Sequence, residues 1–186
     1  RWLWQLDDPR IESILLRMSS SGIERVEEHG AFYSTAVFYR EQRMREVALA
    51  CATGNVVQRR GVARALAQMT DGQVREPTIA PRLSDFFDDD DQSVAGAAAN
   101  AFRSDDLLRS SLGPELAARF VWSKQFARDP HDLVYPLKEF TGDLLPYQPV
   151  LADMVKRART DMADLNGDLR RAGAGFADNA TECILR

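Results

Sequence analysis

Apolar side chains recur along this chain at intervals of three and four residues, and this spacing restricts its fold more than any other feature. Residues i, i+3, i+4 and i+7 lie on one face of an α-helix, so each such stripe predicts an amphipathic helix. No segment shows the sustained apolar–polar alternation and β-branched enrichment that are typical of strands. The sequence therefore predicts an all-α fold of about 8–10 helices. The stripes are Ile11, Ile14, Leu15 and Met18; Met44, Val47, Ala48 and Cys51; Val62, Ala65, Leu66 and Met69; Ile79, Leu83, Phe86 and Phe87; Val94, Ala97, Ala98, Ala101 and Phe102; Leu116, Phe120 and Val121; Leu133, Leu137 and Phe140; Leu151, Met154, Val155, Ala158 and Met162; and Leu169, Ala172, Phe176, Ala180 and Cys183.

Polar caps and helix breakers predict where several of these helices begin and end. Asn55 and Asp91 can accept hydrogen bonds from the free N–H groups of a first helical turn. Gly30 interrupts the stretch 23–39, which we expect to be a less regular helix. Pro146 and Pro149 predict a linker before the helix that carries Leu151.

Two consecutive helix pairs match each other when the sequence is shifted by 36 residues. The shift places Val62, Ala65 and Leu66 on Ala98, Ala101 and Phe102; Val47, Ala50 and Cys51 on Leu83, Phe86 and Phe87; and Asn55 on Asp91. A helix pair that cannot bury its apolar face alone must stack on its neighbours, so the repeat predicts a stacked array.

The segments Asn55–Leu66 and Asp91–Phe102 resemble the second helix of a HEAT repeat. Each has a capping Asn or Asp, then a valine, an alanine-rich face and a large final apolar residue. The resemblance is clear over about residues 40–106, although Ala95 replaces the usual arginine and the second half has no clean copy. It implies a right-handed α-solenoid or superhelix of stacked hairpins. The whole range 1–186 would then be one helical-repeat region of a longer chain, with a looser sub-boundary near 107–114.

Composition and charge narrow the class of protein. The chain is 45% hydrophobic and 28% charged, which is ordinary for a globular domain. Its net charge of -4 disfavours a general nucleic-acid binder. The sequence has neither an apolar run near the ~18 residues of a membrane span nor a signal-peptide pattern, so we expect a cytoplasmic protein. Cys51 and Cys183 are predicted to be buried, and the dominance of arginine over lysine is typical of a bacterial gene rich in GC.

Three motifs that superficially suggest a ligand site lack essential residues. The run Asp88–Asp91 has Ser93 and Ala99 where an EF-hand loop needs glycine and glutamate, so it predicts a helix-start cluster instead. The segment Gly173–Gly175 lacks the third glycine of a dinucleotide-binding loop. His29 and His131 have no second ligand at metal-binding spacing. We therefore expect no metal, no cofactor and no catalytic residues.

A basic ridge is the most distinctive surface feature that the sequence predicts. Arg60, Arg64 and Gln68 lie at i, i+4 and i+8 of one helix, with Arg59 beside them. Second helices line the concave, partner-binding surface of HEAT-like arrays, so the resemblance implies that these four residues bind a partner. A solvated helix face is the alternative interpretation.

A second basic group has the same two interpretations as the ridge. It consists of Lys156, Arg157 and Arg159. Trp122, which stands near other basic residues in the sequence, either stacks on a nucleobase or packs between helices.

The architecture that the resemblance implies is typical of a non-enzymatic recognition or scaffold segment. Its partner would be another protein or the flanking domains of the same polypeptide, which we expect to be a multidomain bacterial protein. By analogy, one setting is the sensor end of a NACHT-like NTPase. Two alternatives stay open: a nucleic-acid-binding module similar to HEAT-like DNA glycosylases, and a HEAT-like lyase. A continuous basic groove would favour the first, and a pocket with convergent polar groups would favour the second.

Overall fold

A computed structural model describes residues 10–36, 42–69 and 79–164, and every regular element in these ranges is helical. The all-α prediction is therefore confirmed. The α-helices outnumber the predicted eight to ten because α7 and α9 are short helices that the apolar pattern did not predict. The elements are α1 (Arg10–Ser19), α2 (Glu24–Ala36), α3 (Gln42–Ala52), α4 (Val56–Met69), α5 (Ile79–Phe86), α6 (Gln92–Ala99), α7 (Asp105–Arg109), α8 (Leu112–Val121), α9 (Lys124–Arg128), α10 (His131–Glu139) and α11 (Gln148–Asp164), with 3-10 turns at Asn100–Arg103 and Leu145–Tyr147. The predicted helix with Leu169 and Cys183, and the segment Gly173–Gly175, lie outside the described residues.

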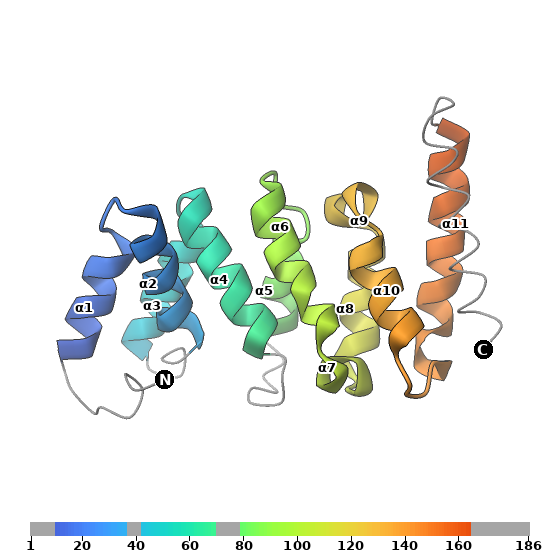
Figure 1. Ribbon diagram of the computed structural model, residues 1–186, viewed down its shortest axis with the longest axis horizontal. Coiled ribbons are helices and arrows are strands. Elements are labelled where there is room, and N and C mark those ends of the chain that lie inside the picture. Colours follow the sequence, from blue (N-terminus) through green and yellow to red (C-terminus); the bar gives the residue numbers. More distant parts are fainter. Residues whose placement is uncertain (1–9, 37–41, 70–78, 165–186) are drawn as a thin grey trace.

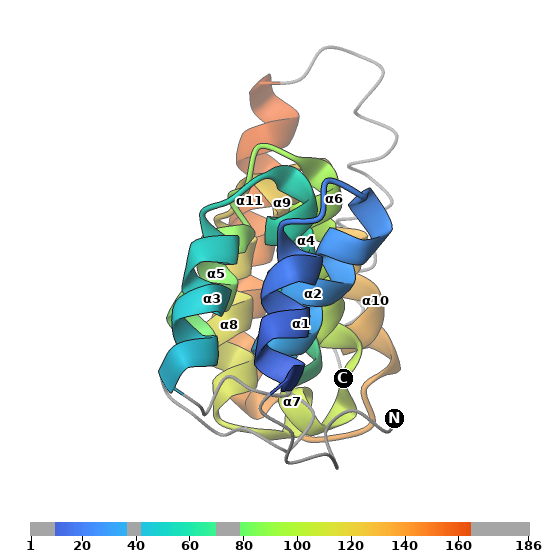
Figure 2. The ribbon, with the colours of Figure 1, turned by 90° about the vertical axis from the view of Figure 1, so that its left-hand side faces the viewer.

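The helices stand side by side along one long axis, from α1 at one end to α11 at the other (Figure 1). The end-on view in Figure 2 shows α3, α5 and α8 on one side, with α2, α4, α6 and α10 on the other. Helix α4 packs against both α2 and α6, and α8 packs against both α5 and α11. The fold therefore consists of two layers of helices, in which each helix contacts its neighbours along the axis.

Hydrogen bonds between neighbouring helix pairs join residues that are 36 positions apart. Arg60 donates to Glu24, Arg64 donates to Glu28, and the backbone N–H of Lys124 donates to Asp88. The same separation relates Arg157 to the carbonyl oxygen of Val121, which accepts from its guanidinium. Other hydrogen bonds between neighbouring helices span 28 to 39 positions, so a separation of 36 recurs among these contacts, also in the second half of the chain, but is one of several.

Side-chain caps begin the two helices that the sequence aligned. Asn55 Oδ1 accepts from the backbone N–H of Gln58 at 3.0 Å, and Gln58 Oε1 accepts from the backbone N–H of Asn55 at 3.1 Å. This reciprocal pair is a capping box. Asp91 Oδ1 accepts from the backbone N–H of Ser93 at 2.9 Å. Both predicted caps are confirmed, and they begin α4 and α6.

A continuous core joins the layers from α2 to α11 and contains buried residues on both sides of 107–114. Three aromatic rings lie at its centre: Phe87, Phe102 and Phe120 pack with centroids 5.0–5.8 Å apart. Ala98 is 0% exposed and Ala101 is 1% exposed, as their positions in the repeat predict. The prediction for Ile14 is wrong, since 43% of this residue is exposed on α1.

The helix predicted within 23–39 is present as α2, and two residues that were expected to disturb regular structure, Gly30 and Pro149, lie inside helices. Gly30 lies within α2 where this helix packs against α1. A Cβ at this position would lie 2.5 Å from the backbone nitrogen of Ser19, so glycine allows α1 and α2 to approach closely. Pro149 lies in the first turn of α11, where its missing N–H removes no helical hydrogen bond. Within residues 10–36, 42–69 and 79–164, no helix is long and apolar enough to cross a membrane.

Candidate binding surface

The predicted ridge residues all lie on α4, but three of them hold internal carboxylates. Arg60 donates from Nη2 to Glu28 Oε2 at 2.6 Å and to Glu24 Oε1 at 2.9 Å. Arg64 donates to the other oxygen of Glu28, and its guanidinium lies 5.9 Å from the centre of the Phe32 ring. These contacts tie the side chains of α4 to α2.

The ion pairs of Glu28 with Arg60 and Arg64 stabilise a carboxylate that is mostly buried in the folded protein. The Glu28 side chain is 11% exposed. Burial alone would raise the pKa of the Glu28 carboxyl, but hydrogen bonds from Arg60 and Arg64 outweigh it and hold the pKa below its ordinary value. The same contacts raise the pKa of Arg60, through Glu28 first and Glu24 second. Removing either arginine would therefore leave a mostly buried carboxylate with less compensating positive charge.

Arg59 points to the opposite neighbour of α4, the loop between α5 and α6. Its Nε and Nη2 donate to the two carboxylate oxygens of Asp89 at 2.8 and 3.1 Å, and its Nη1 donates to the carbonyl oxygen of Gly54 at 2.8 Å. The pKa of Arg59 is raised, chiefly by the hydrogen bonds with Asp89. This bidentate geometry fixes the guanidinium plane, so Arg59 joins two helix pairs.

The acidic run Asp88–Asp91 is a structural junction. Asp88 accepts from the backbone N–H of Lys124 at 2.8 Å, Asp89 holds Arg59, and Asp91 caps α6. Asp90 pairs with the ammonium of Lys124 at 2.8 Å, and this contact is largely exposed. The helix-start interpretation is confirmed for Asp91, and the run also connects α4 and α9 to the loop before α6.

Of the four ridge residues, Arg64 and Gln68 are the exposed ones. The side chain of Arg64 is 47% exposed, whereas the side chains of Arg59 and Arg60 are 25% and 23% exposed. The structure thus brings the three arginines to one helix but directs them to different neighbours. A binding role for the ridge stays a prediction, and a partner would have to compete with the internal carboxylates for Arg59 and Arg60.

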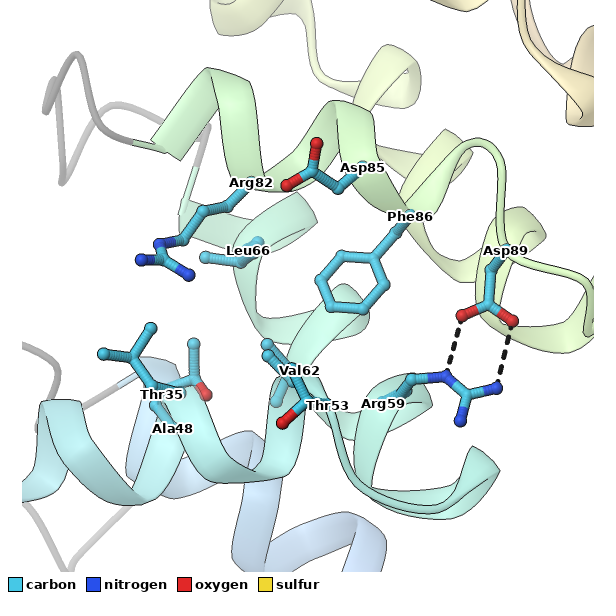
Figure 3. Close-up of a pocket in the computed structure, with 12 residues that line it drawn as sticks. Thr35, Ala48, Thr53, Arg59, Val62, Leu66, Arg82, Asp85, Phe86 and Asp89 are labelled. Atoms are coloured by element: carbon cyan, nitrogen blue, oxygen red, sulfur yellow. Dashed lines mark hydrogen bonds and ion pairs between the residues drawn. The ribbon is translucent and has the colours of Figure 1, made fainter.

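A cleft that the sequence did not predict lies between α3 and α5, with α4 as its floor (Figure 3). The cavity has a volume of about 230 Å³. Its apolar lining includes Ala48 and Ala52 of α3, Val62 and Leu66 of α4, and Phe86 of α5. We call this part of the cleft the apolar slot; the rest of the lining is polar or charged and consists of Thr35, Thr53, Arg59, Arg82, Asp85 and Asp89.

Charged residues stand at opposite ends of this cleft. The Arg59–Asp89 pair closes one end, while Arg82 extends from α5 over the gap near Leu66 at the other (Figure 3). Asp85 lies close by on the same helix. In the part of the chain that the structure describes, neither Arg82 nor Asp85 takes part in an ion pair. The sequence shows both residues on the polar side of a helix, but only the separation of α3 from α5 reveals the slot beneath them.

The second basic group packs around an exposed tryptophan. Trp122, at the end of α8, is 53% exposed, and Lys156 Nζ and the Arg157 guanidinium lie 5.8 and 5.9 Å from its ring. Arg157 also lies 5.5 Å from the Phe126 ring and donates to the carbonyl of Val121. Trp122 therefore makes an inter-helix contact and keeps one side in solvent, while the side chain of Arg159 lies outside the described part.

The histidines and Cys51 have structural surroundings. His29 Nδ1 lies 2.7 Å from the carbonyl oxygen of Arg25, and the His131 ring stacks on Tyr135 at 4.8 Å. Burial raises the pKa of the Cys51 thiol, which is 4% exposed, as expected of a packing residue. Among the described residues, no group of His, Cys, Asp or Glu side chains is arranged to hold a metal ion.

Comparison with known proteins identifies no relative of this chain. No protein-family model matches it, and no curated protein or solved structure is significantly similar to it.

Proposed function

We propose that this chain is part of a right-handed α-solenoid of HEAT-like hairpins and that it recognises a protein partner without catalysing a reaction. The observation that carries the proposal is the stacking of helix pairs along one axis, with hydrogen bonds between residues 36 positions apart at successive junctions. In a solenoid each repeat contacts only its neighbours, so long lateral surfaces are left for extended protein contacts.

The distribution of charge favours a protein partner over a nucleic acid. The chain has a net charge of -4, and the most concentrated basic group, on α4, is largely neutralised by Glu24, Glu28 and Asp89. A protein that binds a DNA duplex needs several free cations along the phosphates. Arginines that are already paired with carboxylates do not supply these free cations.

Two surfaces of α4 are candidates for the contact. Arg64 and Gln68 are exposed on one side, and Val62 and Leu66 form the floor of the α3–α5 cleft on another. Residues of a helix turn by about 100° per position, so these two pairs face different directions. A partner can therefore be assigned to one surface by an experiment that marks each of them separately.

Site-specific photo-crosslinking in the full-length protein, in the cells that make it, tests this function. A photoreactive amino acid replaces Gln68 on the exposed side of α4 or Thr53 at the rim of the cleft, and Ala127 on the exposed side of α9 is the control position. We expect a discrete protein adduct from Gln68 or Thr53 that the control does not give. Adducts no stronger than the control at both positions, or adducts that a nuclease removes, would refute protein recognition by these surfaces.

A further inference from the structure

We propose that the α3–α5 cleft binds one bulky apolar side chain of a partner protein, with a neighbouring aspartate or glutamate of that partner paired to Arg82. This inference rests on the proposed function, and it specifies the chemistry of the partner segment. The site consists of the apolar slot, the closed end at Arg59–Asp89 and the guanidinium over the open end (Figure 3).

The size of the cleft favours a side chain over a cofactor. Its volume of about 230 Å³ lies below the roughly 300–1,000 Å³ of typical small-molecule sites. The lining side chains of Ala48, Val62, Leu66 and Phe86 offer no hydrogen bonds to water inside the slot. An apolar group that enters the slot displaces this water and gains contact with all three helices.

The charged residues that line the cleft determine which polar group of the partner lies next to its apolar side chain. Arg59 and Asp89 satisfy each other, so that end of the cleft offers no free charge. Arg82 has no internal carboxylate within the described residues, and its planar guanidinium can accept a bidentate carboxylate partner. Asp85, one turn along α5, also lines the cleft, but the side chain that extends over the gap is Arg82, so the partner group that pairs with it is a carboxylate.

Two matched dipeptides test this chemistry by NMR titration of the protein. Acetyl-glutamyl-phenylalaninamide carries the apolar group and the carboxylate, whereas acetyl-lysyl-phenylalaninamide replaces the carboxylate with an ammonium. We expect the glutamyl peptide to shift the backbone amide signals of Thr53, Val62 and Phe86, and to bind about three- to fivefold more tightly than the lysyl peptide, because Arg82 is exposed.

Three variants separate the contributions of charge and shape. Arg82→Gln should remove the preference for the glutamyl peptide. Ala52→Phe, which places a ring in the slot, should abolish binding of both peptides, and its thermal melt checks that it folds. Arg103→Gln removes an exposed arginine that does not line the cleft, so the preference should persist.

The outcomes distinguish this inference from the function on which it rests. Equal binding of the two peptides, absence of binding, or shifts that persist in folded Ala52→Phe would overturn the assignment of the cleft. Crosslinking from Gln68 would then still support protein recognition through the other surface of α4. Peptide binding as expected, without any protein adduct in cells, would support the cleft and refute the proposed function.

Discussion

Gly61 lies where α4 crosses α2, and its replacement by alanine tests the packing that holds these two helices together. A Cβ at this position would lie 2.5 Å from the carbonyl oxygen of Glu28, 2.9 Å from the Cβ of Ala31 and 3.2 Å from the nitrogen of Phe32. These atoms belong to the backbone or to a Cβ, so no side-chain rotation relieves the overlap. The two helices would have to move apart, which would also stretch the contacts between Arg60 and Glu28.

Two opposing effects set the expected magnitude. Alanine is favoured over glycine inside a helix by about 0.5–1 kcal/mol. Overpacking a tight contact costs about 1–3 kcal/mol. The cost exceeds the gain, so Gly61→Ala should lower the free energy of unfolding by roughly 1–2 kcal/mol.

Gly96→Ala is the matched control because Gly96 also lies inside a helix. Its added Cβ would meet one atom, Gln125 Nε2, at an ordinary contact distance of 3.8 Å. The helical preference for alanine then acts alone, and the variant should gain about 0.5–1 kcal/mol. The two substitutions are chemically identical but should have opposite signs.

Urea denaturation followed by far-UV circular dichroism measures both variants. The midpoint should fall for Gly61→Ala and rise for Gly96→Ala, with similar slopes against denaturant concentration. If Gly61→Ala is as stabilising as Gly96→Ala, then α2 and α4 do not approach as closely as described, and the stacking argument fails at its central junction.

Three further predictions concern the core, the buried carboxylate and the α11 junction. Ala98→Glu should be severely destabilising because it buries a charge at a position that is 0% exposed, whereas Asn100→Glu at an exposed position should change stability by under about 0.5 kcal/mol. Comparable losses in their melting temperatures would contradict the register of α6. The pKa of Glu28 is lowered in the folded state, so its stabilising contribution is present above the ordinary value of 4.5 and is lost as pH falls through the folded-state pKa. In urea unfolding across this pH range, the free energy of unfolding should fall less on acidification for Glu28→Gln than for the wild type. Parallel pH profiles of the two proteins would contradict a stabilising role of the Glu28 ion pairs. Tyr147→Phe removes the hydrogen bond that the hydroxyl donates to the Leu108 carbonyl at 2.9 Å and should cost about 1 kcal/mol in calorimetry. An unchanged unfolding free energy would show that this bond contributes nothing.

Local features of the sequence predicted most of the longer helices and much of their buried faces, but not the short helices α7 and α9 or the exposure of Ile14. The stripe of α4 and the caps Asn55 and Asp91 act within a few residues, so periodicity and capping chemistry locate them without knowledge of the fold. Gly30 was misread for the complementary reason. Its low helical preference is a local property, but the close approach of α1 that requires a glycine is a tertiary one.

The candidate sites were less predictable because they depend on neighbours that are distant in sequence. The sequence identified Arg60 and Arg64 as members of one helical face, but not Glu28, which lies 32 and 36 positions away from them. The cleft near Arg82 requires the separation between α3 and α5, which no pattern within a single helix encodes. Helical spacing predicted a basic ridge on α4, where the structure contains ion pairs.

Several arginines among the described residues connect neighbouring helices, and this changes where a partner should be sought. Arg60 joins α4 to α2, Arg128 donates to the carbonyls of Asp89 and Asp90, and Arg157 donates to the end of α8. The acceptors of these three arginines lie 32 to 39 positions earlier in the chain, on a neighbouring helix or loop, so the arginines stabilise the junctions between neighbouring helices. A cation outside these connections carries more information about binding. Arg82 forms no ion pair with the residues that the structure describes, and it lies over the apolar slot.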